Sequence, residues 1–452
     1  MLSHTPPAGA AGSSVARCNA AGTVGTVRAA ANGRGHARNL TRNPIRSGPF
    51  AAAALLALPG AAAGLEVNDW LSIGGLIAAG GQCQQVNARL PIAGNGDEYN
   101  GNDYGDGNEN GNGNGNGNGL DDFSNPALLE HSGNICRGGL PVQLEVSLRP
   151  SAQDEFFFLV GFGVDNGLNP VSPFRLAPWA ADLEADVKDI NGRGRDYLLL
   201  AWYRHEFQLP AENALGATFG IINSADYLDD NAFAADEFTQ FMNEAFVNAH
   251  SYDLPAYDAG AALELAAGAF SFHAVGMNVG ENEDGNNFNF WGVQAGWHPE
   301  FALGAGNYRL VLTGTGKQFL DPAGEKKHNR LAWGLSFDQE LGPVFGAFLR
   351  LAWQGEDAAV DYQALYSGGI NINGGPWQRP DDNIGLGYAY LDGGNTDVRR
   401  TNVFEGYYRA QVNEFLAVTA NVQYMSDNLV RENLSQRDPE GWLLGLRLTA
   451  MF

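Results

Sequence analysis

The last eleven residues of the chain, 442–452, read WLLGLRLTAMF and decide the fold. Large apolar residues occupy every second position, and smaller or polar residues stand between most of them. Because a β-strand places successive side chains on opposite faces, one face of this strand suits lipid and the other suits water. The lipid-facing set is predicted to be Trp442, Leu444, Leu446, Leu448, Ala450 and Phe452, and the opposite set Leu443, Gly445, Arg447, Thr449 and Met451.

The same period-two pattern recurs from Trp70 onward, with clusters of Gly, Asn, Asp and Pro between the runs. Clear examples are 142–149, 330–338 and 416–424. A soluble β-sandwich also alternates in this way, so the pattern alone does not choose between the two folds. The connections do choose, because short ones such as 209–213 alternate with long ones such as 224–255. Outer-membrane barrels have such short periplasmic turns and long outer loops.

We therefore expect an all-β fold, a closed antiparallel transmembrane β-barrel of about sixteen strands in the bacterial outer membrane. Charged residues make up 17% of the chain and the mean hydropathy is −0.23, which suits a wall between lipid and water. Past the N-terminus no apolar run approaches the ~20 residues of a spanning helix. The expected partners are the lipid bilayer and, through the aromatic terminal residue Phe452, the barrel-assembly machinery. No nucleic acid is expected.

The N-terminal region differs in charge from the rest of the chain. The first 65 residues contain six Arg and no acidic residue, whereas all 51 acidic residues follow. The apolar run 50–58 comes after Arg42 and Arg46, and the small residues 61–63 precede Gly64. A nine-residue apolar run is too short to span a bilayer and is typical of a secretory signal. We predict that 1–63 is a leader and signal peptide that is removed, and that 64–452 forms the barrel.

Two long connections carry helical rather than strand periodicity. In the first, Pro178 stands at a helix start, Trp179, Leu183, Val187 and Ile190 share a face, and Gly192 follows the end. In the second, Asp236 and Glu237 precede Phe238, Phe241, Met242, Ala245 and Phe246. Two short helices are predicted. Either they cap the loops outside the barrel, or a loop folds inward and narrows the pore.

The mature chain keeps two cysteines, Cys83 and Cys136, because Cys18 lies in the predicted leader. In an exported protein such a pair favours a disulfide over two free thiols. Between them, 95–119 is an Asn-Gly low-complexity stretch, predicted to be a solvated outer loop. Its Asp106, Asn108 and Asn110 match the opening of a calcium loop, but Gly117 stands where the bidentate Glu belongs. We therefore expect no metal and no cofactor.

The sequence contains no local catalytic motif. Its histidines are scattered, its cysteines form no C-x-x-C, and there is no G-x-S-x-G. A serine, a histidine and an acidic residue brought together from different strands would not be visible in the sequence, because such triads are recognised by geometry. We expect a protein that is not an enzyme, with an outer-membrane enzyme as an alternative.

Several consecutive runs resemble the carbohydrate-selective porin family typified by OprB. They are 160–175 (VGFGVDNGLNPVSPFR), 176–203 (LAPWAADLEADVKDINGRGRDYLLLAWY), 227–248 (YLDDNAFAADEFTQFMNEAFVN), 366–374 (YSGGINING) and 379–388 (RPDDNIGLGY). The resemblance covers most of 140–452, and the terminal Phe452 also fits it. It implies a sixteen-stranded outer-membrane barrel that passes mono- and oligosaccharides. The Asn-Gly stretch and its flanking cysteines depart from the family.

The strand phases place a mixed set of charged residues on the inner face, where a water-filled lumen can hold them. These pore-lining candidates are Glu145, Arg149, Arg309, Arg330, Asp338, Arg350, Glu405, Arg409 and Arg447. Aromatic rings that could stack on sugars are Tyr197, Tyr203 and Tyr407. The function expected is passive diffusion of sugars. The alternatives are a general or anion-biased porin, an enzyme, and a structural barrel with a plugged lumen.

Overall fold

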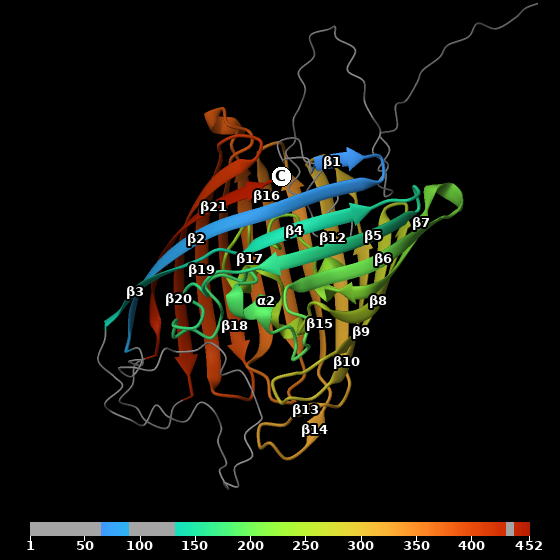
Figure 1. Ribbon diagram of the computed structural model, residues 1–452. Coiled ribbons are helices and arrows are strands. Elements are labelled where there is room, and N and C mark those ends of the chain that lie inside the picture. The colour runs from blue at the N-terminus through green and yellow to red at the C-terminus, as the bar shows by residue number, and fades with distance from the viewer. Residues whose placement is uncertain (1–64, 90–131, 431–437) are drawn as a thin grey trace, which may run out of the picture.

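The computed structural model describes residues 65–89, 132–430 and 438–452, and their strands close into one antiparallel barrel (Figure 1). Consecutive strands pair around the sheet, and the predicted sixteen-stranded barrel is confirmed. The wall consists of β2 (Leu71–Arg89), β3 with β4 (Ser132–Gly139 and Val142–Leu148), β5 (Asp154–Phe162), β6 (Leu198–Gln208), β7 (Ala214–Ile222), β8 (Asp258–Ala267), β9 (Phe270–Val279), β10 (Phe288–Trp297), β12 (Gly304–Thr315), β15 (Leu331–Leu341), β16 (Phe345–Gln354), β17 (Tyr362–Asn373), β18 (Asn383–Gly393), β19 (Val398–Gln411), β20 (Leu416–Leu429) and β21 (Glu440–Met451).

The barrel closes where β2 pairs with β21, with Gly80 opposite Arg447 and Leu76 opposite Met451. On its other edge β2 pairs with both β3 and β4, which form one strand interrupted at Leu140 and Pro141. Proline has no N–H to donate to the ladder, which fits the interruption. Short strands β1 (Leu65–Asn68) and β11 (Glu300–Phe301) add to this sheet, and β13 (Phe319–Leu320) pairs with β14 (Lys327–His328) in a separate hairpin.

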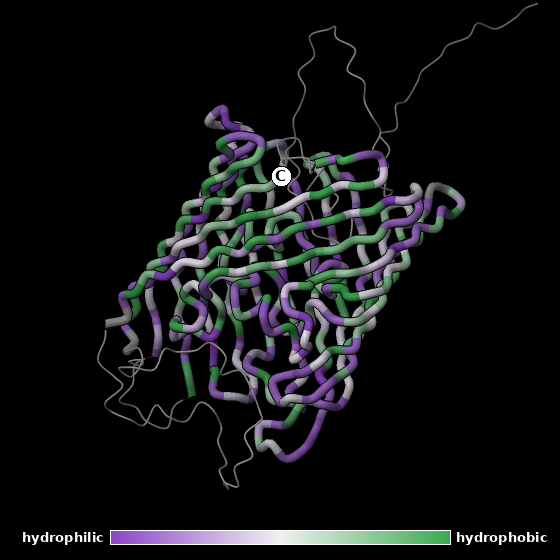
Figure 2. The backbone as a smooth tube through the Cα atoms, viewed as in Figure 1, coloured by the Kyte–Doolittle hydropathy of each residue, from purple (hydrophilic) through white to green (hydrophobic). Residues whose placement is uncertain are grey.

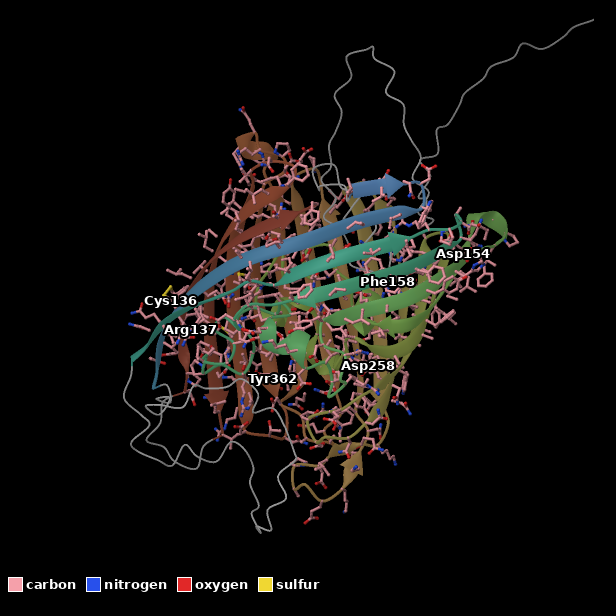
Figure 3. All side chains as sticks on the ribbon, in the orientation of Figure 1. Cys136, Arg137, Asp154, Phe158, Asp258 and Tyr362 are labelled. Atoms are coloured by element: carbon pink, nitrogen blue, oxygen red, sulfur yellow. A yellow bond between two sulfur atoms is a disulfide. The ribbon has the colours of Figure 1, made fainter. Side chains whose placement is uncertain are left out.

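Exposure alternates along the strands, as predicted for side chains that point to opposite faces of the wall. Figure 2 shows hydrophobic and hydrophilic residues interspersed along these strands, and Figure 3 draws the side chains on them. In β21, Leu444 is 62% exposed on the outer face while its neighbour Leu443 is fully buried on the inner face. The exposed apolar residues of the other strands, such as Leu331 and Trp333 of β15, follow the same rule. The outer face is therefore apolar, and most of the ionisable wall residues point inside.

The connections differ at the two ends of the barrel. Those at 149–153, 209–213, 268–269, 342–344 and 412–415 are short, and they define the short-turn end. At the opposite, long-loop end lie 163–197, 223–257 and 316–330. Two connections break the strict alternation, because 374–382 at the short-turn end is longer than 394–397 at the long-loop end. The backbone of Phe452 pairs with Gly75 at the short-turn end.

The described residues contain two short α-helices, α2 (Glu184–Lys188) and α3 (Glu244–Val247). Both were predicted, but each is shorter than the sequence indicated. In the second segment, Asp236 caps a single turn by accepting from the N–H of Phe238 and Thr239. The helix does not continue from that turn, because the Glu405 carboxylate accepts from Met242 and Asn243, whose N–H groups a longer helix would use internally. No helix among the described residues has the length and apolar character to cross a membrane.

In the first segment, residues 178–183 lie in extended or turn conformation because they pack against the wall and a neighbouring loop. The N–H of Ala180 donates to the carbonyl of Met242, and the carbonyl of Pro178 accepts from Gln82 and Gln423. Tertiary hydrogen bonds thus replace the helical ones there. The helix predicted from Pro178 to Ile190 is reduced to Glu184–Lys188, in its C-terminal half.

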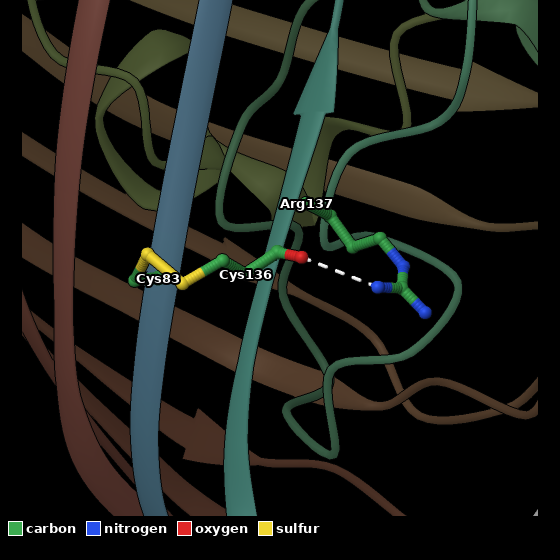
Figure 4. The surroundings of a disulfide bond; sticks show 3 residues. All are labelled: Cys83, Cys136 and Arg137. Atoms are coloured by element: carbon green, nitrogen blue, oxygen red, sulfur yellow. Dashed lines mark hydrogen bonds between the residues drawn. A yellow bond between two sulfur atoms is a disulfide. The ribbon is translucent and has the colours of Figure 1, made fainter.

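Cys83 and Cys136 are directly opposite each other on β2 and β3 and form a disulfide (Figure 4). Their Cα atoms are 4.0 Å apart, and both residues are exposed on the outer face of the barrel. The predicted leader 1–63, the Asn-Gly stretch 95–119 and the calcium candidates Asp106, Asn108 and Asn110 lie outside the described residues.

Candidate functional site: two loops inside the barrel

Two of the long connections fold into the barrel rather than away from it. We call 163–197 loop A and 223–257 loop B. Loop B contains η4 (Ser224–Asp226), α3 and η5 (His250–Tyr252), and its Phe238, Phe241 and Phe246 are almost fully buried. Phe241 lies edge-on to Phe348 and Tyr407 of the wall. Of the two possibilities for the helical segments, the structure contains the inward-folded one.

Glycines of the wall make room for the aromatic side chains of both loops. A Cβ at Gly387 would lie 2.8 Å from a ring carbon of Phe246 and 3.0 Å from one of Phe241. At Gly80 and Gly334 a Cβ would collide with the ring of Trp179 and with the hydroxyl of Tyr252. Glycine within a strand often marks such a close approach. These glycines are the sequence signal that could have located the inner loops.

Arg350 of β16 is the central anchor of loop B. Its guanidinium is fully buried and pairs with the Asp229 carboxylate at 2.8 Å. It also donates to the carbonyl oxygens of Phe246 and Ala234, at 3.0 and 2.8 Å. Burial raises the pKa of Asp229, although the neighbouring Arg350 opposes that shift. A buried charge needs such partners, and here loop B supplies all of them.

A second anchor uses Glu405 of β19 and Arg447 of β21. The Glu405 carboxylate accepts hydrogen bonds from the backbone N–H of Met242 and Asn243, at 2.8 and 2.9 Å. Arg447 donates to the carbonyl oxygens of Glu237 and Gln240, at 2.6 and 3.0 Å. Glu405 thus accepts hydrogen bonds from backbone N–H groups of the loop, and Arg447 donates hydrogen bonds to its backbone carbonyls.

A third anchor lies on β12 and β15. The buried guanidinium of Arg309 contacts Asp230 of loop B at 2.7 Å and Asp338 of the wall at 2.6 Å. Asp338 also accepts a hydrogen bond from the N–H of Ala232, at 3.2 Å. Loop B is therefore held from β12 around to β21, across about half of the strands in the wall.

Loop A is joined to loop B and to the wall. Trp179 donates its indole N–H to the carbonyl of Glu237, and the Glu244 carboxylate accepts from the N–H of Ala177. The Tyr257 hydroxyl donates to Asp182. On the far side, Arg193 contacts Asp258, which lies at the start of β8 and is labelled in Figure 3. The two loops form one inner assembly, and its side chains come from the runs that carried the family resemblance.

His250 and Glu244 form an ion pair inside this assembly, with His250 Nδ1 3.1 Å from Glu244 Oε1. Burial works to lower the pKa of His250, but the hydrogen bond and the charge of Glu244 outweigh it, and the net shift is upward. For Glu244, burial works to raise the pKa, yet the contact with His250 makes the net shift downward. The pair therefore favours the doubly charged form.

The predicted pore-lining residues divide into two groups. Arg309, Asp338, Arg350, Glu405, Arg447 and Tyr407 do point inward, but each is buried beneath loop B rather than exposed to an open lumen. They therefore do not line an open pore, as had been expected. The alternation along a strand predicts which face of the wall a side chain is on, but it does not predict whether a loop covers that face. Tyr407 accepts hydrogen bonds from Asn371 and Asn383.

Other candidates remain partly exposed. Near the short-turn end, Glu145 is half-buried on the inner face and Arg149 pairs with Glu155 at 3.0 Å. Arg409 is half-buried on the same face. Near the long-loop end, Arg330 pairs with Asp253 at 2.8 Å and also contacts Glu283. Burial works to lower the pKa of Arg330, but the charges of these two acids outweigh it and the net shift is upward.

Tyr203 and Tyr197 were placed wrongly. Tyr203 lies on the outer face between Phe156 and Phe219, and its hydroxyl donates to Asp154 at 2.6 Å. Tyr197 stacks on the exposed Phe162. On β6, the residues directly before and after Tyr203 point inward instead. Arg204, buried with Glu206 and Glu264 at 3.4 and 3.3 Å, was missed by the sequence analysis.

Within the described parts of the chain, no group of three or more His, Cys, Asp or Glu residues is arranged to hold a metal ion. The ionisable residues that cluster inside the barrel alternate in sign and neutralise one another. Polar side chains of the wall hold both loops in place through hydrogen bonds and ion pairs. What it offers a passing solute is the set of half-buried polar side chains at either end of the inner assembly.

No protein-family model matches this chain. An uncharacterised protein of Aquifex aeolicus (strain VF5) is 29% identical over 254 residues, which are 56% of this chain and 72% of that protein. The high-pH structure of Pseudomonas putida OprB has a TM-score of 0.61 at 14% identity, covering 86% of this chain and 95% of OprB. The channel DcaP of Acinetobacter baumannii has a TM-score of 0.47 at 8% identity, covering 84% and 97%. The likeness to OprB shows that this chain has a porin-type barrel fold.

Proposed function

We propose that this protein is a bacterial outer-membrane porin through which small neutral carbohydrates diffuse passively, with loops A and B forming the constriction. The observation that carries the proposal is the inner assembly, a pair of loops fixed inside a porin-type barrel by buried Arg and carboxylate anchors. Fixed loops narrow the lumen without closing the barrel wall. The apolar outer face supports insertion in a bilayer.

The carbohydrate class is supported by two features. The runs that resemble the carbohydrate-selective porins, 176–203 and 227–248, supply most of loops A and B. The half-buried residues at the ends of the assembly pair acids with bases, as Arg149 does with Glu155 and as Arg330 does with Asp253. Such pairs offer hydrogen-bond donors and acceptors to hydroxyl groups while presenting little net charge to an ion. Binding must stay weak for conduction.

Orientation and processing follow from the same proposal. The short-turn end faces the periplasm and the long-loop end faces outward. Phe452, half exposed at the short-turn end, is the residue that the barrel-assembly machinery would contact. Residues 1–63 are removed on export, and 95–119 belongs to an outer loop. No cofactor takes part.

Planar-bilayer recordings of the purified protein test this function. Glucose or a short oligosaccharide should reduce the single-channel current more than a size-matched polyether does, because only the sugar has many hydroxyl groups that can both donate to and accept from the polar side chains of the constriction. Equal reduction by both solutes would leave a general porin. A reversal potential strongly displaced toward anions in a salt gradient would favour the anion-biased alternative, and the absence of any conductance would favour a structural barrel.

Matched variants locate the sugar contacts. Arg149→Gln and Arg409→Gln change half-buried inner residues, whereas Lys326→Gln changes an exposed residue of the turn between β13 and β14. The first two should weaken sugar block and the third should not. A response to Lys326→Gln equal to the others would mean that the effect comes from general charge and not from contacts in the lumen.

A further inference from the structure

A chain of hydrogen bonds at the short-turn end joins a serine, a histidine and an asparagine from three different segments. Ser271 is the second residue of β9, His298 directly follows β10, and Asn307 lies on β12. Ser271 Oγ is 2.8 Å from His298 Nε2, and His298 Nδ1 is 2.8 Å from Asn307 Oδ1. A hydroxyl, an imidazole and an orienting group in this order are the parts of an activated nucleophile.

The network determines which imidazole nitrogen carries the proton. Asn307 Nδ2 donates to Asp338 Oδ1 at 2.5 Å, and the same carboxylate is held by Arg309 at 2.6 Å. Because a carboxylate only accepts, the Asn307 amide nitrogen must face it, and the amide oxygen therefore faces His298. An oxygen opposite Nδ1 requires the proton on Nδ1. Nε2 is then unprotonated and accepts from the Ser271 hydroxyl, as a general base does.

The surroundings keep this arrangement in place. Ser271 is opposite Gly296 in the β9–β10 ladder, and a Cβ at position 296 would collide with Ser271 Oγ and lie 2.8 Å from His298 Nε2. The His298 N–H donates to the carbonyl of Ala269 in the adjacent turn at 2.7 Å. Burial has the largest effect and lowers the pKa of His298; Asn307 and Asp230 act to raise it, Arg309 and His273 act to lower it, and the net shift is downward. The imidazole is thus neutral near pH 7.

The serine is also reachable. Its neighbours Phe270 and Phe272 are exposed on the outer face, so Ser271 points inside the barrel, and both Ser271 and His298 are only half-buried. It lies beside the short turn 268–269, at the barrel rim. A small solute that enters from this end meets the hydroxyl directly. Passive diffusion through the constriction does not require a serine hydroxyl that is hydrogen-bonded to an imidazole.

We propose that Ser271, His298 and Asn307 form a hydrolytic site for small carboxylic esters that enter from the short-turn end. Ser271 Oγ attacks the ester carbonyl carbon while its proton passes to His298 Nε2. The bond from that carbon to the alcohol oxygen breaks, and the leaving alcohol takes the proton from Nε2. Water then attacks the acyl-serine by the same route, which releases the carboxylic acid and restores the hydroxyl. Asn307 is a positioning residue that holds the imidazole.

The test uses the purified, folded protein, a fluorophosphonate probe with peptide mapping by mass spectrometry, and hydrolysis of p-nitrophenyl acetate. We expect the probe to modify Ser271, and Ser271→Ala or His298→Gln to lower the hydrolysis rate by about 100-fold or more, the usual contribution of a general base. Ser151→Ala is the matched control, because Ser151 is an exposed serine near the same rim that bonds Asp154 and no imidazole. It should change nothing.

Asn307→Ala should lower kcat with little change in KM, and the activity of the parent protein should fall as acid protonates His298. A structural role alone would produce neither effect. The proposal is overturned if the folded protein labels Ser271 no faster than denatured protein does, or if Ser271→Ala retains the activity. Single-channel conductance should be unchanged in Ser271→Ala, so loss of esterase activity and loss of the porin function are separate outcomes.

Discussion

Arg447 on the last strand donates a 2.6 Å hydrogen bond to the carbonyl of Glu237, which lies 210 residues earlier in the chain. This hydrogen bond attaches the middle of loop B to the inner face of the barrel wall. Arg447→Met would keep an unbranched apolar stem and remove every donor. Each buried carbonyl left without a partner costs roughly 1–3 kcal/mol. We expect faster hydrogen exchange at 237–243 and a larger single-channel conductance, and an unchanged conductance would show that this part of loop B does not limit the pore.

The Asp229–Arg350 pair offers a double-mutant cycle. Arg350→Met alone leaves a buried carboxylate unpaired and should destabilise the protein by about 3–5 kcal/mol. Asp229→Asn is the other single change, and the double variant removes both charges and should cost less than Arg350→Met alone. Urea unfolding in detergent gives the four free energies of unfolding, those of the parent protein, the two single variants and the double variant. Additive losses would contradict a direct contact between the two side chains.

The His250–Glu244 pair predicts a pH dependence. The pKa of His250 is raised in the folded protein, so its contribution is complete below about pH 6.5, the ordinary value, and is lost as pH rises through the raised pKa. Glu244, Asp253 and Asp361 favour the charged imidazole, and the ring of Tyr362 lies edge-on to it. Raising pH from 6 to 9 should loosen the link between loops A and B and increase fluctuations of the open-channel current.

His250→Gln removes the titrating group while keeping a hydrogen-bond donor toward Glu244. Its current noise should not vary with pH over the same range. If the variant and the parent protein respond equally, the pH dependence belongs to another group.

The disulfide predicts a measurable contribution to stability. Cys83 and Cys136 are 53 residues apart in the chain. Closing a loop of that length stabilises the folded state by about 4 kcal/mol on the loop-entropy model. Reduction should therefore lower the urea midpoint, and a Cys83→Ser/Cys136→Ser variant should match the reduced protein. Two alkylatable thiols in the unreduced protein would disprove the bond in solution.

Strand phase was predictable because it is a local property. The alternation in 442–452 placed Arg447 on the inner face, and the same argument placed Glu405 and Arg350 there correctly. The alternating lengths of the connections identified a barrel. These features depend only on neighbouring residues and on the two environments that a wall separates.

The contents of the barrel were not predictable in the same way. Whether Arg350 meets water or the backbone of loop B depends on contacts between residues more than 100 positions apart. In β6, polar and aromatic residues occupy both faces. The sequence therefore did not show which of the neighbours Trp202 and Tyr203 points inward and which points outward. The Ser271–His298–Asn307 chain joins three segments and left no local motif.

The disulfide also affects which side chains of β2 face the lipid. Cys83 lies on β2, the strand that also forms the closing seam with β21, and the bond to Cys136 sets the pairing of β2 with β3. A slip of one residue would turn Gln82 and Gln84 toward lipid and Cys83 toward the interior. The disulfide therefore holds β2 and β3 in one register, with Cys83 opposite Cys136, while the other edge of β2 pairs with Gly445 and Leu443 of β21. The cross-link opposes a slip of β2 relative to β3 directly beside the closing seam.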